Sequence, residues 1–207
     1  MILRIMDNFY QETKDIYRLR VPFEELYTSV FLVRTSIGAI LVDCATTTND
    51  VDLHIVLALK NFGYELTDIR IIVLTHQHSD HAGGLARVLD LAPNIKVVRD
   101  VCVLCDSVAT DRLAGHTTDC IGLLDTRSKT LISKDGLQGA GVGKYRCYVG
   151  DVEAYFETIT RIKNDKRIQN ILFSHAYKPW NKDRINERSN VDACILECIK
   201  YVKRKTK

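Results

Sequence analysis

Apolar and polar residues alternate in short runs over the first part of the chain, a pattern that predicts β-strands. These strands are expected at residues 15–21, 29–33 and 39–43, the last of them after a turn at 36–38. The period changes to that of a helix over residues 49–62, where an apolar residue recurs at every third or fourth position. Gly63 follows this segment and is expected to end the helix in a left-handed conformation.

Beyond this helix, short apolar runs alternate with further helical segments. Strands are expected at residues 69–74, 95–98, 101–104, 121–124, 130–133 and 170–173. A short helix is expected over 85–91, and longer helices are expected to begin at Asp151 and Ser189. Two groups of strands with helices beside them predict an α/β layered fold. Because the sequence shows no repeat or Pro-rich linker, we expect one domain over residues 1–207.

The composition excludes a membrane protein and a disordered chain. Of the 207 residues, 46% are hydrophobic and 27% are charged, as in ordinary globular proteins. No apolar run approaches the roughly 20 residues that cross a bilayer. The net charge of +3 is too small to indicate a nucleic-acid partner, and the lysines near the C-terminus are interpreted as a solvated tail. No signal peptide is visible, so we expect a cytoplasmic protein; the oligomeric state is left open.

The seven cysteines are expected to be reduced thiols. Cys102 and Cys105 form the only CxxC pair, and no second pair lies at the spacing of a zinc site. Because this pair lies in an apolar stretch that is interpreted as a strand, both residues are interpreted as buried core thiols. Cys194 and Cys198 share one face of the last helix and are also expected in the core.

The most informative stretch lies between the expected strand at 69–74 and the expected helix at 85–91. It contains His76, His78, Asp80 and His81 within six positions. In extended backbone, residues i and i+2 point the same way, so the first two histidines can bind one ion. Asp80 and His81 can reach a second ion as the chain turns into the helix. The spacing therefore predicts a metal site.

Three more candidate ligands occur near the ends of other expected strands. His116 precedes a strand, Asp135 ends one, and His175 follows one. Apolar strands that carry His or Asp at their ends predict a metal site at one rim of a sheet. Behind the first histidines, Gly83 and Gly84 let the backbone pack closely. The one histidine outside this pattern, His54, lies within the first expected helix and is given no role.

These motifs resemble those of the metallo-β-lactamase superfamily of metallohydrolases. The His-x-His-x-Asp-His block at 76–81 resembles its signature, and later motifs are matched by Gly115-His116-Thr117, Asp135 and His175. Leu41-Val42-Asp43 resembles the strand end whose Asp supports the metal loop. The resemblance covers nearly the whole chain. It implies a four-layer αββα sandwich, the metallo-β-lactamase fold, with the metal site at the edge of the two sheets.

The same resemblance implies two divalent metal ions per chain and assigns their ligands. One ion is implied to take His76, His78 and His116, and the other Asp80, His81 and His175, with Asp135 and a hydroxide between them. Five imidazoles and two carboxylates fit zinc first, with manganese or iron as alternatives. Asp80 and Asp135 are the expected catalytic residues, because they hold the ions and orient the hydroxide, and Asp80 could pass a proton to the leaving group.

Within the superfamily, the resemblance is closest to glyoxalase-II-like and lactonase-like hydrolases. The glycine-rich stretch 135–145 resembles the loop after the bridging aspartate, where Lys144 and Tyr145 would contact the substrate. Tyr177 matches a substrate-side tyrosine. The resemblance does not extend to the helical glutathione-binding domain that follows in glyoxalase II. It implies hydrolysis of a small ester-type substrate, a thioester or lactone.

Other functions remain open on the same fold. An iron-dependent, persulfide-dioxygenase-like oxidoreductase would contain about one iron per chain. A phosphodiesterase or nuclease would need extra nucleic-acid-binding segments, which this compact chain lacks, so a small-molecule substrate is expected. A non-catalytic domain with a degenerate site is disfavoured, because all seven ligand positions are filled.

Overall fold

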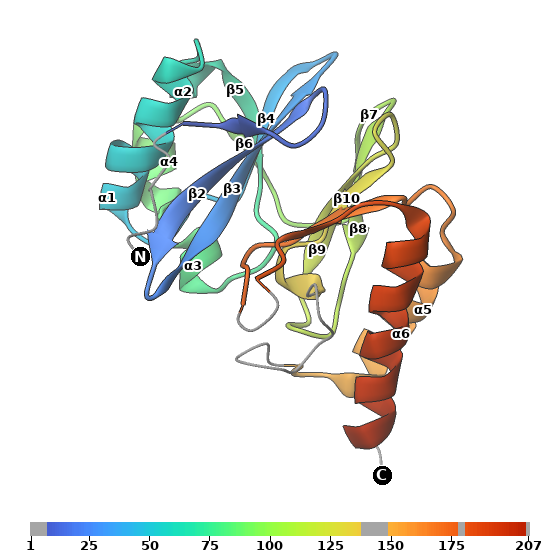
Figure 1. Ribbon diagram of the computed structural model, residues 1–207. Coiled ribbons are helices and arrows are strands. Elements are labelled where there is room, and N and C mark those ends of the chain that lie inside the picture. Colours follow the sequence, from blue (N-terminus) through green and yellow to red (C-terminus); the bar gives the residue numbers. More distant parts are fainter. Residues whose placement is uncertain (1–7, 138–148, 178–180, 206–207) are drawn as a thin grey trace. The chain divides into compact units, whose positions relative to one another are not determined.

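The computed structural model describes residues 8–137, 149–177 and 181–205. The chain divides into two compact units, unit 1 (Met1–Arg99) and unit 2 (Asp100–Lys207). Each unit contains one six-stranded sheet and its own helices (Figure 1). The expectation that residues 1–207 form one domain stays a prediction.

The sheet of unit 1 follows the order β1-β2-β3-β4-β5-β6. Its strands are β1 (Tyr10–Gln11), β2 (Ile16–Phe23), β3 (Leu26–Thr35), β4 (Gly38–Val42), β5 (Ile69–Val73) and β6 (Lys96–Val98). The first four strands pair antiparallel, whereas β4, β5 and β6 pair in parallel. Parallel neighbours need long crossovers. Helices fill these crossovers. Because β4 and β5 are parallel, their carboxyl ends lie at one edge of the sheet.

The helices of unit 1 lie in these crossovers. They are α1 (Thr48–Asp50), η1 (Val51–Val56), α2 (Leu57–Asn61), η2 (Leu66–Asp68), α3 (Ser79–Ala82) and α4 (Leu85–Leu91). The first three follow one another directly and form the helix predicted over 49–62. A capping box between Thr47 and Asp50 begins it, and Gly63, with φ +87°, ends it as predicted. Its central part, η1, is a π-helix, which the sequence pattern did not reveal.

The core of unit 1 lies between the sheet and this helix. Leu19 of β2 and Leu32 of β3 belong to the same buried cluster as Val51, Ile55 and Leu59. Burying one such side chain contributes roughly 1.5–3 kcal/mol. The cluster therefore fixes the helix on the sheet and leaves the carboxyl end of β4 in a defined position.

The sheet of unit 2 follows the order β12-β11-β10-β9-β8-β7. Its strands are β7 (Val103–Cys105), β8 (Val108–Arg112), β9 (Ile121–Asp125), β10 (Thr130–Ile132), β11 (Asn170–Leu172) and β12 (Arg184–Ile185). Only β10 and β11 pair in parallel. The helices are η3 (Lys134–Gly136), α5 (Val152–Asn164) and α6 (Arg188–Lys205). Figure 1 shows α5 and α6 side by side, and they share a buried cluster that includes Tyr155, Ile159, Val191 and Ile195.

Several predictions about unit 2 are wrong in detail. The strand β8 was not predicted, and α6 begins at Arg188, so Ser189 lies inside the helix. Cys102 and Cys105 are half-buried rather than core thiols, because β7 is an edge strand of the sheet. Cys194 and Cys198 are buried in the core, as predicted.

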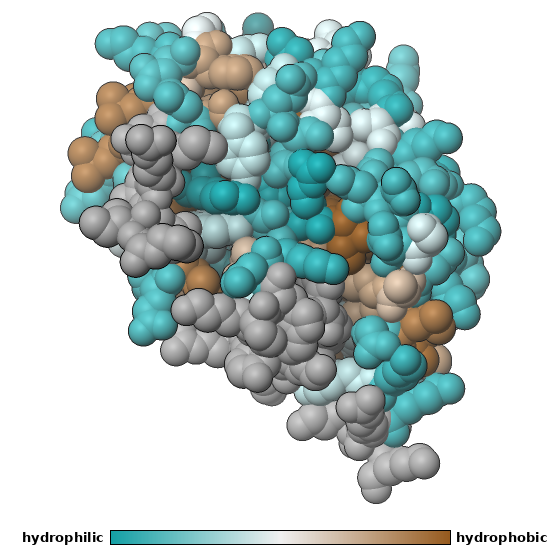
Figure 2. All heavy atoms as spheres, in the orientation of Figure 1, coloured by the Kyte–Doolittle hydropathy of each residue, from teal (hydrophilic) through white to brown (hydrophobic). Residues whose placement is uncertain are grey.

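The coloured part of the face drawn in Figure 2 is mainly polar. Most atoms visible in Figure 2 belong to hydrophilic residues. Large exposed apolar side chains include Leu53 and Leu57, on successive turns of η1 and α2, and Val103 on β7. Among the helices of the described ranges, none combines the length and the apolar character needed to cross a membrane.

Candidate metal centre

In unit 1, two histidines of the segment after β5 face each other. His78 has an extended backbone, with φ −62° and ψ 149°, at the residue before α3. Nε2 of His76 lies 3.1 Å from Nδ1 of His78. Two nitrogens bound to one tetrahedral Zn²⁺ at 2.0–2.1 Å would lie about 3.3 Å apart. The two ring nitrogens therefore already have nearly the separation that a shared ion requires.

The next two candidate ligands lie in the first turn of α3. Oδ2 of Asp80 lies 3.0 Å from Nε2 of His81, and both side chains are buried. The rings of His76 and His81 lie close as well, with centroids 4.1 Å apart. Unit 1 thus gathers the four predicted ligands of the sequence block into one cluster of His and Asp side chains.

Asp43 supports this cluster, as the resemblance implied. It follows β4 directly and is completely buried. Its carboxylate accepts a hydrogen bond from the backbone N–H of Thr75 at 2.8 Å and lies 2.6 Å from Nδ1 of His81. Asp43 has φ +63°, a left-handed conformation that Asp tolerates better than most residues.

The two glycines after α3 allow two backbone segments to touch. A Cβ at Gly83 would lie 1.9 Å from the carbonyl oxygen of Thr46, and one at Gly84 would lie 2.2 Å from that of Cys44. The backbone N–H of Cys44 also donates to the carbonyl of His81 at 2.9 Å. The predicted close packing behind the loop is confirmed, and it holds α3 against the end of β4.

Unit 2 positions the three remaining predicted ligands around one carboxylate. His116 lies in the loop between β8 and β9, Asp135 lies in η3, and His175 follows β11. One oxygen of Asp135 lies 3.4 Å from Nε2 of His175, and the other lies 3.9 Å from Nε2 of His116. All three residues are buried. Strand β10 ends at Ile132, so Asp135 lies in a 3-10 turn beyond the strand that was expected to end with it.

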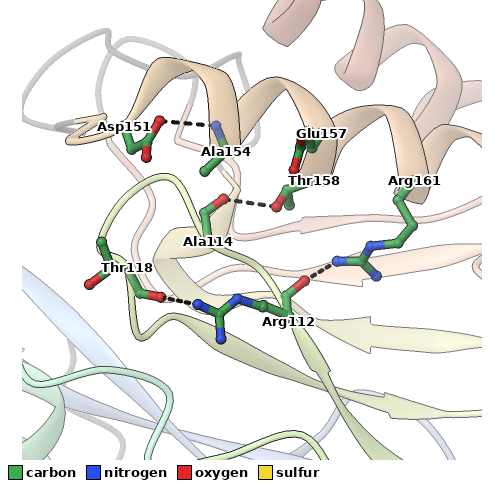
Figure 3. Close-up of a pocket in the computed structure, with 8 residues that line it drawn as sticks. All are labelled: Arg112, Ala114, Thr118, Asp151, Ala154, Glu157, Thr158 and Arg161. Carbon is green, nitrogen blue, oxygen red and sulfur yellow. Dashed lines mark hydrogen bonds between the residues drawn. The ribbon is translucent and has the colours of Figure 1, made fainter.

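Helix α5 holds the loop that carries His116 (Figure 3). The hydroxyl of Thr158 donates to the carbonyl of Ala114 at 2.8 Å. The backbone N–H of Asp151 donates to the carbonyl of Gly115 at 3.0 Å. Gly115 has φ +136°, and a Cβ there would lie 2.4 Å from Cβ of Tyr155. Only glycine fits this position, so the loop is fixed directly on the helix.

A small pocket of about 230 Å³ lies between this loop and α5 (Figure 3). Its charged lining residues are two of each sign, namely Arg112, Arg161, Asp151 and Glu157. Both arginines donate to backbone carbonyls, Arg112 to that of Thr118 and Arg161 to that of Arg112. Ala114 and Thr118 line the pocket, whereas His116 between them does not.

Three polar residues beside the ligands had been given no place in the site by sequence reasoning. The hydroxyl of Thr75 lies within hydrogen-bonding distance of Asp43 and His76. Lys134 is completely buried, with φ +51°. Burial raises the pKa of the Cys120 thiol to about 12, against an opposing effect of its hydrogen bonds with Thr117. Thr75 and Lys134 stand directly before predicted ligands, which is the one signal the sequence offered.

The predicted substrate residues are only partly described. Tyr177 is half-buried, and its ring centroid lies 5.1 Å from that of His175. Lys144 and Tyr145 lie outside the described residues. Their contact with a substrate stays a prediction.

Comparison with known proteins places this geometry in a family. The model of the metallo-beta-lactamase superfamily matches residues 24–101, which include the whole His-x-His-x-Asp-His block. The FIM-1 metallo-β-lactamase of Pseudomonas aeruginosa, solved in a mono-zinc form, matches with a TM-score of 0.72 at 16% identity, covering 94% of this chain and 96% of that one. A metallo-β-lactamase of Erythrobacter litoralis gives a TM-score of 0.69 at 16% identity, covering 93% and 96%.

Over residues 24–101 the sequence is that of a metallo-β-lactamase superfamily protein. The predicted fold class is confirmed as the metallo-β-lactamase fold, with two mixed six-stranded sheets, flanking helices and His/Asp clusters of the metal-binding type. Within the superfamily it is distantly related to hydroxyacylglutathione hydrolases (glyoxalase II).

Two of these curated relatives illustrate the distance. The hydroxyacylglutathione hydrolase of Pseudomonas savastanoi pv. phaseolicola is 30% identical over 153 residues, 58% of this chain and 56% of the relative. That of a Prochlorococcus marinus strain is 26% identical over 190 residues, 78% of this chain and 71% of the relative. The chain spans little more than half the length of the first curated relatives that it matches.

Proposed function

We propose that this superfamily protein is a hydrolase with a dinuclear metal site that cleaves a small ester-type substrate, a thioester or a lactone. The observation that carries the proposal is the position of Asp135. Its two carboxylate oxygens face different histidines, His175 and His116. A carboxylate placed in this way suits a bridge between two ions better than a ligand of one.

We infer that the seven side chains serve the two ions in two groups. By the resemblance to the superfamily, the first group would comprise His76, His78 and His116, and the second Asp80, His81 and His175, with Asp135 between the two ions. The separations within each unit support this division, because the facing donor atoms lie 3.0–3.4 Å apart in three of the pairs. Imidazole and carboxylate ligands without a thiolate suit zinc first, and manganese or iron as alternatives.

Two divalent ions, when bound, would lower the pKa of a shared water toward neutrality and polarise the carbonyl under attack. The protein's part is to place acceptors around that water. Asp80 and Asp135 are buried carboxylates that can accept its hydrogen bonds and fix its direction of attack. Asp80 can then carry the proton to the departing oxygen or sulfur.

The choice of an ester-type substrate is supported by the curated relatives, which are hydroxyacylglutathione hydrolases. It is supported as well by Tyr177, whose ring lies beside that of His175. A phenol at this place can donate a hydrogen bond to a substrate that reaches the metal ligands. Lys144 and Tyr145 are proposed to contribute a cation and a second phenol.

The first experiment is elemental analysis of protein purified with each metal supplied in excess. Two ions per chain, predominantly zinc, are expected. His78→Gln should lose one ion, whereas His54→Gln, a histidine outside both groups, should retain two. Saturation at a single iron would contradict the hydrolase and favour the persulfide-dioxygenase-like oxidoreductase.

The second experiment is a panel of thioesters, lactones, β-lactams and phosphodiesters, assayed with the two-metal protein. We expect kcat/KM to be highest for a thioester or lactone and to vanish after chelation. Activity confined to phosphodiesters would overturn the substrate class and leave the metal assignment intact.

A further inference from the structure

A chain of hydrogen bonds connects two of the candidate ligands of unit 1 behind the cluster. Nδ1 of His76 lies 3.3 Å from the hydroxyl oxygen of Thr75. That oxygen lies 3.0 and 2.9 Å from the two carboxylate oxygens of Asp43, and Asp43 lies 2.6 Å from Nδ1 of His81. All four side chains are buried, at 2% exposure or less. The connection therefore runs without access to bulk water.

The number of protons decides the direction of each bond. A threonine hydroxyl has one proton to donate, and a carboxylate only accepts. The Thr75 proton must then go to Asp43, so the contact with His76 requires the ring to donate from Nδ1. The same reasoning makes Nδ1 of His81 a donor to Asp43. A neutral ring at either position is thereby held in the tautomer that leaves the lone pair on Nε2.

In both rings, Nε2 is the atom that faces the next candidate ligand. Nε2 of His76 lies 3.1 Å from Nδ1 of His78, and Nε2 of His81 lies 3.0 Å from Asp80. The hydrogen bonds on the far side of each ring therefore direct the lone pairs to where an ion would bind. Groups of this kind orient metal-binding histidines and increase their basicity.

We propose that Thr75 is a positioning residue that couples the two metal positions. Through one hydroxyl it connects His76, a ligand of the first proposed group, to the carboxylate that orients His81, a ligand of the second. The inference rests on the proposed metal site for its consequence, but the hydrogen bonds themselves belong to the protein without metal.

The backbone explains why the hydroxyl can be removed without removing the fold. The N–H of Thr75 donates to Asp43 at 2.8 Å independently of the side chain. The backbone N–H of Asp43 donates to Val73, and that of Cys44 donates to His81, both at 2.9 Å. Thr75→Val keeps these bonds and nearly the same volume, and removes only the group that joins His76 to Asp43.

The test begins with nitrogen-15 NMR of the histidine rings in metal-free protein, which distinguishes protonated from unprotonated ring nitrogens. The wild type should show Nδ1–H for both His76 and His81, and bare Nε2 for His76. In Thr75→Val, His76 should become a mixture of tautomers, while His81 stays Nδ1–H. Thr75→Ser retains the hydroxyl and should restore the wild-type pattern. A wild-type His76 protonated on Nε2 would overturn the proposal.

Zn²⁺ titration against a competing chelator gives the second readout. Thr75→Val should bind Zn²⁺ about 10-fold more weakly, and Thr75→Ser within about 3-fold of wild type. Thr110→Val is the matched control, because Thr110 is also buried and its hydroxyl donates to a carbonyl at 2.7 Å, away from the ligands. It should lower the unfolding temperature and leave Zn²⁺ affinity unchanged. Equal affinities of Thr75→Val and wild type would refute the coupling.

The two proposals fail in different ways. If the wild type binds no divalent ion, the proposed hydrolase falls, and the NMR pattern still decides whether Thr75 fixes the His76 tautomer. If the wild type binds two ions and Thr75→Val binds them equally well, the metal site stands and Thr75 is only a buried structural residue.

Discussion

The carboxylate of Asp43 lies 2.6 Å from Nδ1 of His81, and both side chains are completely buried. The two residues are far apart in the sequence and meet because β4 and β5 are parallel neighbours with their carboxyl ends at the same edge. The geometry of a candidate metal ligand thus depends on a residue that directly follows another strand, β4.

Asp43→Asn is expected to weaken metal binding and destabilise unit 1. An amide offers one acceptor oxygen in place of two, so it cannot accept from both Thr75 and His81 as the carboxylate does. A buried donor left without its acceptor costs about 1–3 kcal/mol, and loss of such a support reduces metal affinity by about 10–100-fold. Chemical denaturation with chelator and Zn²⁺ titration measure the two effects separately.

Asp52→Asn is the control for this substitution. Asp52 pairs with Arg87 at 2.9 Å, but both side chains are partly exposed, so the pair contributes only about 0–1 kcal/mol. Metal affinity equal in the two variants would show that Asp43 does not support the site.

Asp135→Ala is expected to empty at least one metal position and abolish turnover, because it removes the carboxylate that faces both His116 and His175. Metal content and kcat are the measurements. Asp125→Ala removes another buried carboxylate, one that accepts hydrogen bonds from Arg127 and Ser128. This control should lose about 1–2 kcal/mol of stability and keep both ions. Loss of metal in Asp125→Ala, with both ions retained in Asp135→Ala, would show that Asp135 is not the bridging aspartate.

Tyr177→Phe is expected to raise KM about 5-fold for a turned-over ester, the equivalent of one neutral hydrogen bond of about 1 kcal/mol. Metal content and kcat should stay near the wild-type values, because the ring beside His175 is retained. Tyr64→Phe, on a ring that stacks on Phe62 in unit 1, should change neither constant. An unaltered KM in Tyr177→Phe would remove this phenol from the substrate site.

The buried thiol of Cys120 is expected to resist alkylation at neutral pH. Burial raises its pKa from 9.0 to about 12, so little thiolate is present in the folded protein, and half-buried Cys102 should react first with iodoacetamide. Because the folded pKa is the higher one, this thiol favours folding most below pH 9.0 and loses that contribution as the pH rises toward about 12.

Denaturation at several pH values tests the second part of this prediction. The free energy of unfolding should fall above pH 9.0, and Cys120→Ala should fall less steeply. Parallel curves for the two proteins would mean that Cys120 ionises equally easily in both states.

The parts of the fold that the sequence predicted best are those with strong local periodicity. Helix α4 occupies residues 85–91 as expected, and Asp151 caps α5 through its side chain. Strand β8 was missed, because Thr110, Asp111 and Arg112 interrupt its apolar character. Its pairing with β9 defines it, and such pairing leaves no signal in a single chain.

The candidate site shows the same limit. The ligand residues could be found from their types and spacing, because imidazoles and carboxylates near strand ends are conspicuous. The role of Thr75 could not, because it depends on the register of β4 against β5, which brings its hydroxyl to Asp43. Likewise, the half-buried state of Cys105 follows from the position of β7 at a sheet edge rather than from its apolar neighbours.

The contact of the Gly83–Gly84 backbone with residues 44–46 has a consequence for how this segment can vary. In a library of all single substitutions, tolerance should not follow distance from the ligands. Gln77 and Ser79 stand between ligand residues and are exposed, so many side chains should be accepted there. Gly83 and Gly84, which are not candidate ligands, should accept almost none, because any side chain would strike a carbonyl oxygen. At Gly83 and Gly84, substitutions are thus limited by the space between two backbone segments and not by metal binding.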